Sequence, residues 1–145
     1  MANRSIAGGL VLMLVLFSSA CGDVRSYGAD LNPGLGCSYG YVVVENHDTF
    51  DWKQVRVIVN SLYYADLIAL RAGQSVQLLP REFIRGDGTI LNFELTACVS
   101  VSVHATAPNG AGYVEITNSG RRLDGVYTIR RPEPKTADGS PAHQK

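Results

Sequence analysis

The sequence predicts an all-β protein, an immunoglobulin-like β-sandwich of about seven or eight strands. Short segments rich in β-branched and aromatic residues recur along the chain, and such residues favour strands. Clusters of Gly, Asn, Asp and Pro separate these segments roughly every 8–12 residues, a spacing typical of sandwiches and barrels. No segment of the predicted domain shows the apolar period of a long helix. A small closed β-barrel is the alternative.

The first predicted strands are residues 38–46 and residues 54–60. The earlier segment is rich in Tyr and Val. The later one places Val55, Val57 and Val59 on one face and mostly polar side chains on the other. Strict alternation of this kind indicates a strand with one buried face.

The middle of the chain is less clear. Residues 62–70 allow either a strand, which the paired tyrosines favour, or a short helix, which the Ala and Leu content favours. Residues 75–79 form a strand that ends at Pro80. Asp87-Gly88 predicts a hairpin turn because both residues tolerate positive φ, and its arms are residues 82–84 and 89–95.

Alternation returns in residues 98–105. Val99, Val101 and Val103 share one face, and Cys98 lies on the opposite face with Ser100, Ser102 and His104. Residues 113–117 and 126–130 are the last two strands, and we expect them to form a hairpin around a polar turn.

Residues 1–20 have the layout of a secretory signal peptide. Arg4 precedes an apolar run, residues 6–17, and the small residues after it lead to Cys21. The run is short for a membrane-spanning helix, which needs about 20 apolar residues. A retained span and ordinary secretion are the two alternatives to lipid attachment.

With a cysteine directly after the cleavage point, this segment resembles the signal of bacterial lipoproteins, although Ser18 stands where that family usually has Leu, Val or Ile. The resemblance implies that Cys21 is acylated and becomes the first residue of the mature chain. It also implies an outer-membrane location on the periplasmic face, because Gly22 stands where inner-membrane retention would want Asp.

Four segments follow from this interpretation: a signal peptide (residues 1–20), a lipidated tether (21–36), the β-sandwich domain (37–131) and a disordered tail (132–145). The tether is rich in Gly, Asp, Asn and Pro, and the tail in Pro, Ala and polar residues. The chain has thirteen basic and thirteen acidic residues. A balanced charge gives no reason to expect nucleic acid as a partner.

If Cys21 carries lipid, Cys37 and Cys98 remain in an oxidising compartment. An even number of cysteines favours one disulfide there, and two unpaired buried thiols are the alternative. The alternation of side chains along the two predicted strands places both cysteines on the outer face of one sheet or at its edge. A bulge in either strand would reverse this assignment.

Residues 39–95 resemble small uncharacterised β-sandwich domains of bacterial secreted proteins. The resemblance is carried by turn and core residues and implies no activity. These residues are Phe50-Asp51-Trp52 and Val55-Arg56-Val57 within residues 46–60, then residues 70–73, Phe83 and Asp87-Gly88.

Several short motifs have a structural explanation as well as a functional one. Residues 36–40 fit Gly-x-Ser-x-Gly around Ser38, but a nucleophile elbow needs a strand before it and a helix after it. Residues 85–87 spell Arg-Gly-Asp, which turn chemistry also explains. His47, Asp48 and Asp51 lack the spacing of a calcium loop. We expect Asn46 and Asp48 to cap the turn instead.

Two surfaces are candidates for binding. Aromatic side chains, Phe50, Trp52 and the tyrosines, could stack on a ligand, although core packing is the commoner role. A basic patch is possible where four arginines flank the last two strands: Arg121, Arg122, Arg130 and Arg131.

These observations predict a non-enzymatic, membrane-anchored envelope lipoprotein that acts as a binding or assembly module. Its expected partners are the lipid bilayer, through acyl chains on Cys21, and an envelope protein. No cofactor and no metal are expected. The alternative function is a periplasmic inhibitor of a lysozyme-like wall-degrading enzyme, a class that resembles this chain in size, anchor, β content and one disulfide.

Overall fold

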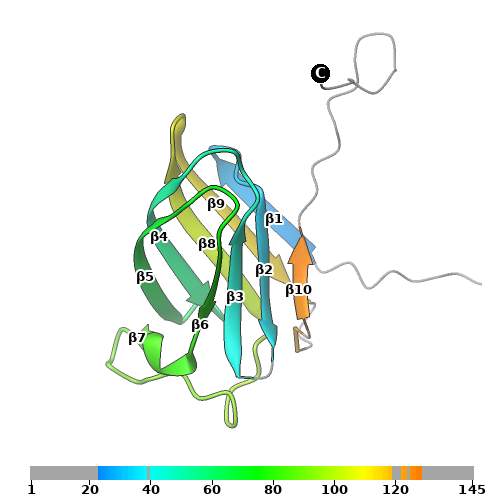
Figure 1. Ribbon diagram of the computed structural model, residues 1–145. Helices are drawn as coiled ribbons and strands as arrows, with labels where there is room; N and C mark the ends of the chain where they lie inside the picture. The colour runs from blue at the N-terminus through cyan, green and yellow to red at the C-terminus, as the bar shows by residue number, and fades with distance from the viewer. Residues whose placement is uncertain (1–22, 39, 119–121, 124, 129–145) are drawn as a thin grey trace, which may run out of the picture.

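The computed structural model describes residues 23–38, 40–118, 122–123 and 125–128. In these residues ten strands form two antiparallel sheets that pack as two layers (Figure 1). The predicted β-sandwich is confirmed, and the alternative of a closed barrel is wrong because the strands divide into two separate sheets.

The larger sheet has six strands in the order β1-β9-β8-β4-β5-β7. Their bounds are β1 (Asp23–Gly28), β4 (Trp52–Val59), β5 (Tyr63–Leu70), β7 (Ile84–Arg85), β8 (Ser100–Ala107) and β9 (Gly110–Thr117).

The smaller sheet has four strands in the order β10-β2-β3-β6. Their bounds are β2 (Pro33–Ser38), β3 (Tyr41–Asn46), β6 (Ser75–Leu78) and β10 (Gly125–Thr128). A single 3₁₀ turn, η1 (Pro80–Glu82), follows β6 in the described part of the chain.

The core lies between the two sheets and consists mainly of valine and leucine. Val55, Val57 and Val59 are buried as the alternation of β4 predicted. Trp52 is also fully buried although it is three residues from Val55. A β-bulge between Lys53 and Arg56 adds one residue to β4, so that the side chains of Trp52 and Val55 both face the core.

The segment expected to be a tether is instead part of the domain. Residues 23–28 and 33–38 form β1 and β2, so the sandwich includes these segments and does not begin at residue 37. Glycine misled the sequence analysis because it usually weakens strands. In β2 it permits close approach: a Cβ at Gly36 would collide with the backbone of Gly125 in β10.

Three other expectations changed. Residues 62–70 form a strand, which settles the choice against a helix. The hairpin arm expected at residues 89–95 is a loop that pairs only through the Ile84–Ile90 bridge. The last two strands are not a hairpin, because β9 lies in the larger sheet and β10 in the smaller one.

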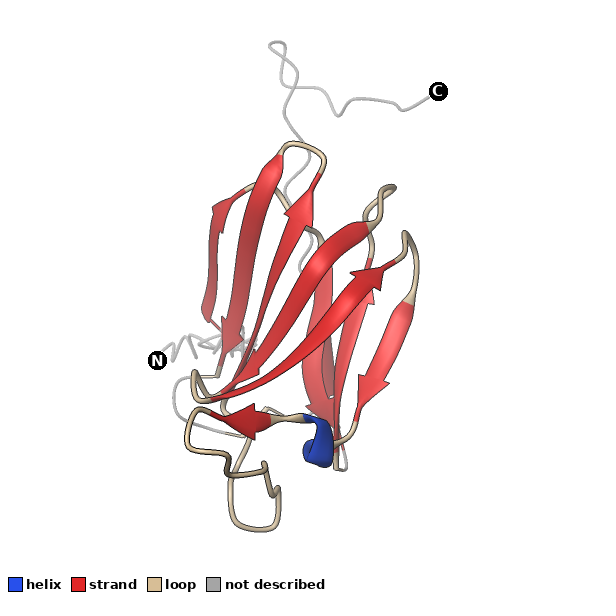
Figure 2. Ribbon diagram, turned by 90° about the vertical axis from the view of Figure 1, so that its left-hand side faces the viewer, coloured by secondary structure: helices blue, strands red, loops and turns tan. Residues whose placement is uncertain are grey.

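The sandwich has two ends, which we name after a residue at each. At the Asp23 end, Asp23 of β1 is paired with Thr117 of β9, which pairs with Ser100 of β8. The turn at residues 60–62 and the loop of residues 86–99 also lie there, as do η1 and β7 (Figure 2). The Trp52 end carries the turns at residues 29–32, 46–51, 71–74 and 108–109.

Candidate functional site

Five neighbouring strands of the larger sheet place one side chain each in a row across its outer face. The register pairs Tyr27 with Tyr113, Tyr113 with His104, His104 with Arg56, and Arg56 with Asp66. Residues that face each other directly across antiparallel strands project from the same face of the sheet. We call these five residues the outer-face row.

The first half of the row is aromatic. The rings of Tyr27 and Tyr113 stack with their centroids 5.5 Å apart, and the ring of His104 tilts against Tyr113 at 4.4 Å. These three side chains, with Arg25 and Glu115, line an open hollow of about 500 Å³. Exposed rings beside charged groups can stack on a planar or apolar ligand while the charges orient it.

The second half of the row is charged. Arg56 donates two hydrogen bonds to Asp66, from Nε at 2.6 Å and from Nη2 at 2.7 Å. Its guanidinium also lies over the ring of Tyr64, 4.8 Å from the centroid. The pair is half exposed, so it contributes little to stability. The pair with Asp66 holds the planar guanidinium of Arg56 in a fixed orientation on the surface.

The surroundings of the outer-face row shift the pKa values of His104 and Tyr113. Partial burial, followed by the positive charge of Arg56, lowers the pKa of His104 below its ordinary value. Burial, followed by the nearby Glu115, raises the pKa of Tyr113. At neutral pH the row therefore presents a neutral imidazole and a protonated phenol, each of which can donate and accept hydrogen bonds.

The bulge in β4 is what aligns Arg56 with this row. Gln54 adopts a positive φ of 49° at the bulge, and the hydroxyl of Thr106 donates to its side-chain oxygen at 3.2 Å. After this irregularity Val55 points into the core and Arg56 points outward. A local backbone distortion thus places the row's cation.

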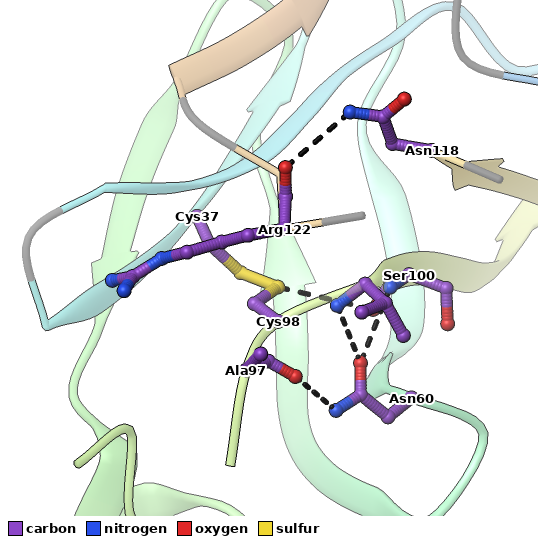
Figure 3. Close-up of a disulfide and its surroundings, with 8 residues drawn as sticks. Cys37, Asn60, Ala97, Cys98, Ser100, Asn118 and Arg122 are labelled. Atoms are coloured by element: carbon purple, nitrogen blue, oxygen red, sulfur yellow. Dashed lines mark hydrogen bonds between the residues drawn. A yellow bond between two sulfur atoms is a disulfide. The ribbon is translucent and has the colours of Figure 1, made fainter. Parts of the chain in front are cut away.

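The predicted disulfide between Cys37 and Cys98 is present (Figure 3). Both cysteines are buried, and the bond joins β2 of the smaller sheet to the segment just before β8 of the larger sheet. The expectation that they lie on an outer face or an edge is therefore wrong. Cys98 precedes the strand, so the alternation of β8 does not extend to it.

Asn60 fixes the segment that carries Cys98. Its side-chain oxygen accepts hydrogen bonds from the backbone nitrogens of Val99 and Ser100, and its amide nitrogen donates to the carbonyl of Ala97 (Figure 3). The backbone nitrogen of Leu123 also donates to the carbonyl of Cys98 at 2.7 Å. These bonds replace regular strand pairing immediately before β8.

The residues considered for a metal site serve the Trp52 end instead. One carboxylate oxygen of Asp48 accepts hydrogen bonds from the indole of Trp52 at 2.8 Å and from the backbone of Asn32 at 3.1 Å. Asp51 accepts one from the backbone of Ala72. His47 contacts Glu45 at 2.8 Å. The side-chain oxygen of Asn46 accepts a hydrogen bond from the backbone nitrogen of Asp48 at 2.9 Å, as expected of a residue that caps this turn.

The Arg-Gly-Asp and Gly-x-Ser-x-Gly segments also have a structural explanation. In the Arg-Gly-Asp segment, the backbone of Gly88 donates to the carbonyl of Arg85, and a carboxylate oxygen of Asp87 accepts from the backbone of Thr89. These are turn contacts. Ser38 ends β2 and leads into β3, so it lacks the strand-to-helix turn of a nucleophile elbow.

Only part of the predicted basic patch can be placed. Arg122 is exposed at the Asp23 end and its carbonyl accepts a hydrogen bond from Asn118. Arg121, Arg130 and Arg131 lie outside the described residues, as does Cys21, the predicted lipidation site. The patch and the lipid therefore stay predictions.

Sequence reasoning missed the outer-face row as a unit. His104 was expected only on the polar face of a strand, and Tyr27 was expected within the tether. The tyrosines were considered as a binding surface, but only strand register shows which of them meet. The alternation of residues 98–105 placed His104 on an outward face, and that was the one usable signal.

In the described part of the chain, no group of three or more His, Cys, Asp or Glu side chains is arranged to hold a metal ion. Within the same residues no helix is long and apolar enough to cross a membrane. No protein-family model, curated protein or solved structure was found to match this chain.

Proposed function

We propose that this chain is a membrane-anchored envelope lipoprotein whose β-sandwich is a non-enzymatic binding module, with the outer-face row as its contact surface. The observation that carries the proposal is the alignment of Tyr27, Tyr113, His104 and Arg56 on four adjacent strands. Tyrosine and arginine are the residues that most often dominate binding energy at protein interfaces.

The row is rigid, which favours binding. Its side chains project from five paired strands of one sheet, from the edge strand β1 to β5, and not from loops. Their rings and the Arg56–Asp66 pair hold one another in place. A surface that is already ordered loses little side-chain entropy when a partner binds. An envelope protein is the partner class we propose.

The anchor is the second part of the proposal. Its support is the signal-like layout of residues 1–20 and the position of Cys21. Replacing Cys21 with Ser should release the protein from the membrane fraction. Intact mass of membrane-extracted protein should correspond to residues 21–145 plus acyl chains; an unmodified mass would contradict the anchor.

Site-specific photo-crosslinking in intact cells tests the contact surface. A benzophenone amino acid replaces Tyr27 in one strain and Gln77 in the control strain; Gln77 is an exposed residue of β6 in the other sheet. We expect a defined crosslinked partner from position 27 that disappears when Arg56→Ala is added. Equal crosslinking from both positions, or none from position 27, would contradict the proposed surface.

The identity of the partner would decide between two kinds of module. A structural or assembly protein would fit the main proposal. If the crosslinked partner is a wall-degrading enzyme, and the purified protein inhibits lysozyme at micromolar concentration, the module is an inhibitor of that class.

A further inference from the structure

Exposed aliphatic side chains gather at the Asp23 end of the sandwich. Leu62 follows β4, Ile84 begins β7, and Ile90 and Leu95 lie in the loop that follows it. Leu95 is the most exposed of the four, at 85%. Folding has left these side chains in water, where each exposed aliphatic surface has a cost that a suitable contact would remove.

Backbone hydrogen bonds hold this apolar group in a defined arrangement. Ile84 pairs with Ile90, Arg85 donates to the carbonyl of Thr89 at 2.8 Å, and Leu91 donates to the carbonyl of Phe83 at 3.1 Å. The loop is therefore braced against β7. An open groove of about 590 Å³, lined mainly by apolar side chains including Leu79, Ile90 and Phe93, lies beside it.

The position of Cys21 in the sequence indicates which surface could cover the apolar side chains at the Asp23 end. Cys21 is two residues before Asp23, the first residue of β1. Two residues span at most about 7 Å. Asp23 pairs with Thr117, which pairs with Ser100, whose carbonyl accepts a hydrogen bond from Asn60, the residue beside the turn that carries Leu62.

We infer that the Asp23 end lies against the bilayer that holds the acyl chains of Cys21, with Leu62, Ile84, Ile90 and Leu95 entering the boundary between headgroups and acyl chains. The inference rests on the proposed lipid anchor and deepens it. Because only Gly22 separates Cys21 from β1, the anchor holds the Asp23 end near the membrane surface. β1 and β7 are the opposite edge strands of the larger sheet, so the apolar group reaches the bilayer when the full width of this end lies on it. Apolar side chains at such a boundary are buried by roughly 5–10 Å in interfacial membrane proteins.

Charge contributes less than apolar contact at this end. The described basic residues of this end include Arg81, Arg85 and Arg122, and the acidic ones include Asp23, Glu82, Asp87 and Glu94. Arg85 contacts Asp87 at 3.5 Å. Opposite charges in such proximity leave little net attraction for an anionic surface. The contact should therefore depend weakly on the fraction of anionic lipid in the membrane.

Tryptophan fluorescence in vesicles tests this orientation. The chain has a single tryptophan, Trp52, which is buried at the opposite end and supplies a constant background. Leu95→Trp places a second one at the Asp23 end. Ile68→Trp is the matched control, because Ile68 is 94% exposed on β5 near the Trp52 end. Both proteins are purified in the acylated form and reconstituted into phosphatidylcholine vesicles with and without brominated acyl chains.

We expect brominated lipid to quench about half of the emission added by Leu95→Trp and almost none of that added by Ile68→Trp, since only the former would reach the acyl boundary. Added anionic lipid should change this difference little. Equal, weak quenching of both variants in protein whose mass shows acylation would overturn the orientation alone. An unacylated mass would overturn the anchor itself.

A second position guards against a local folding defect. If Leu95→Trp fails to form the Cys37–Cys98 bond, Leu62→Trp provides the same measurement from the neighbouring turn. Quenching at neither position, in folded and acylated protein, would leave the apolar end facing water or a protein and would contradict contact with the bilayer.

Discussion

At the Trp52 end of the sandwich, polar side chains close the turns, whereas at the Asp23 end a disulfide and the amide of Asn60 hold the chain and apolar side chains remain exposed. Asn46 is completely buried at the Trp52 end and donates to the carbonyls of Phe50 and Leu70, both at 3.0 Å. Its side-chain oxygen accepts a bond from Asp48. Most polar groups at that end therefore bond to one another, although the side-chain oxygen of Asn32 is buried there without a hydrogen-bond partner in the described structure.

The two ends differ in which side chains they leave available for contact with another molecule. Hydrogen-bonded turns need no external partner for their polar groups, although Ile68, on β5 near the Trp52 end, is itself 94% exposed. The Asp23 end is fixed covalently and therefore tolerates exposed Leu and Ile side chains that do not stabilise the fold. Such side chains are available for an external contact.

The largest expected effect comes from removing the covalent link. The two cysteines are 61 residues apart, and a loop of that length predicts that Cys37→Ala/Cys98→Ala lowers the free energy of unfolding by about 4 kcal/mol. Denaturant unfolding followed by Trp52 fluorescence measures it. A loss under about 1 kcal/mol would show that packing alone holds the Asp23 end.

A somewhat smaller loss is expected at the opposite end. Asn46→Ala leaves two buried carbonyls and one backbone nitrogen without their partner, which should lower the free energy of unfolding by about 3 kcal/mol. The same denaturation experiment applies. Asn92→Ala removes one exposed hydrogen bond, from the backbone nitrogen of Glu94, and is the control; it should lower the free energy of unfolding by no more than about 1 kcal/mol. Similar losses in both variants would mean that the Trp52 end is not organised around Asn46.

His104, on the outer face of the larger sheet, should make a small, pH-dependent contribution to the free energy of unfolding. Because the pKa of His104 is lowered in the folded protein by burial and by Arg56, the unfolded chain binds a proton more readily. Stability from this group is therefore complete above about pH 6.5 and declines as the pH falls toward the folded pKa.

Two measurements check the titration. NMR titration of the imidazole should give a pKa below 6.5 in the folded protein, and His104→Asn should remove the matching decline in stability. A folded pKa above that value would contradict the influence of burial and Arg56.

The smallest effect on stability is expected from Leu95, the most exposed aliphatic side chain of the loop at the Asp23 end. Leu95→Ser removes a side chain that lies almost entirely in water, so the free energy of unfolding should change by less than about 0.5 kcal/mol. Leu78→Ala is the core control and should cost about 2–5 kcal/mol. A loss of the control's size in Leu95→Ser would show that the exposed loop belongs to the folding core.

The sequence predicted the strands whose one face is buried. β4 and β8 carry alternating valines because each has a core side and a solvent side, and period-two patterning reports that difference directly. β1 escaped prediction because all six of its residues are exposed. β2 escaped because glycines replace the expected side chains where it lies close to β10.

The outer-face row shows why the site was harder to predict than the fold. Tyr27 and Tyr113 are 86 positions apart in the sequence, and only the pairing of β1 with β9 brings them together. Register depends on which strands become neighbours, which local patterning does not encode. The disulfide was predictable from cysteine number, but its place in the core was not.

The antiparallel pairing of β1 has a mechanical consequence for an anchored protein. If Cys21 carries the proposed lipid, a pull on it is transmitted to the first residue of β1, and the bonds to β9 would break one pair at a time from Asp23 toward Gly28. β2 would follow until the chain becomes taut at Cys37, about 55 Å of extended chain from the anchor. Beyond that point the bond to Cys98 carries the load, and the strands between the two cysteines are enclosed in a covalent ring.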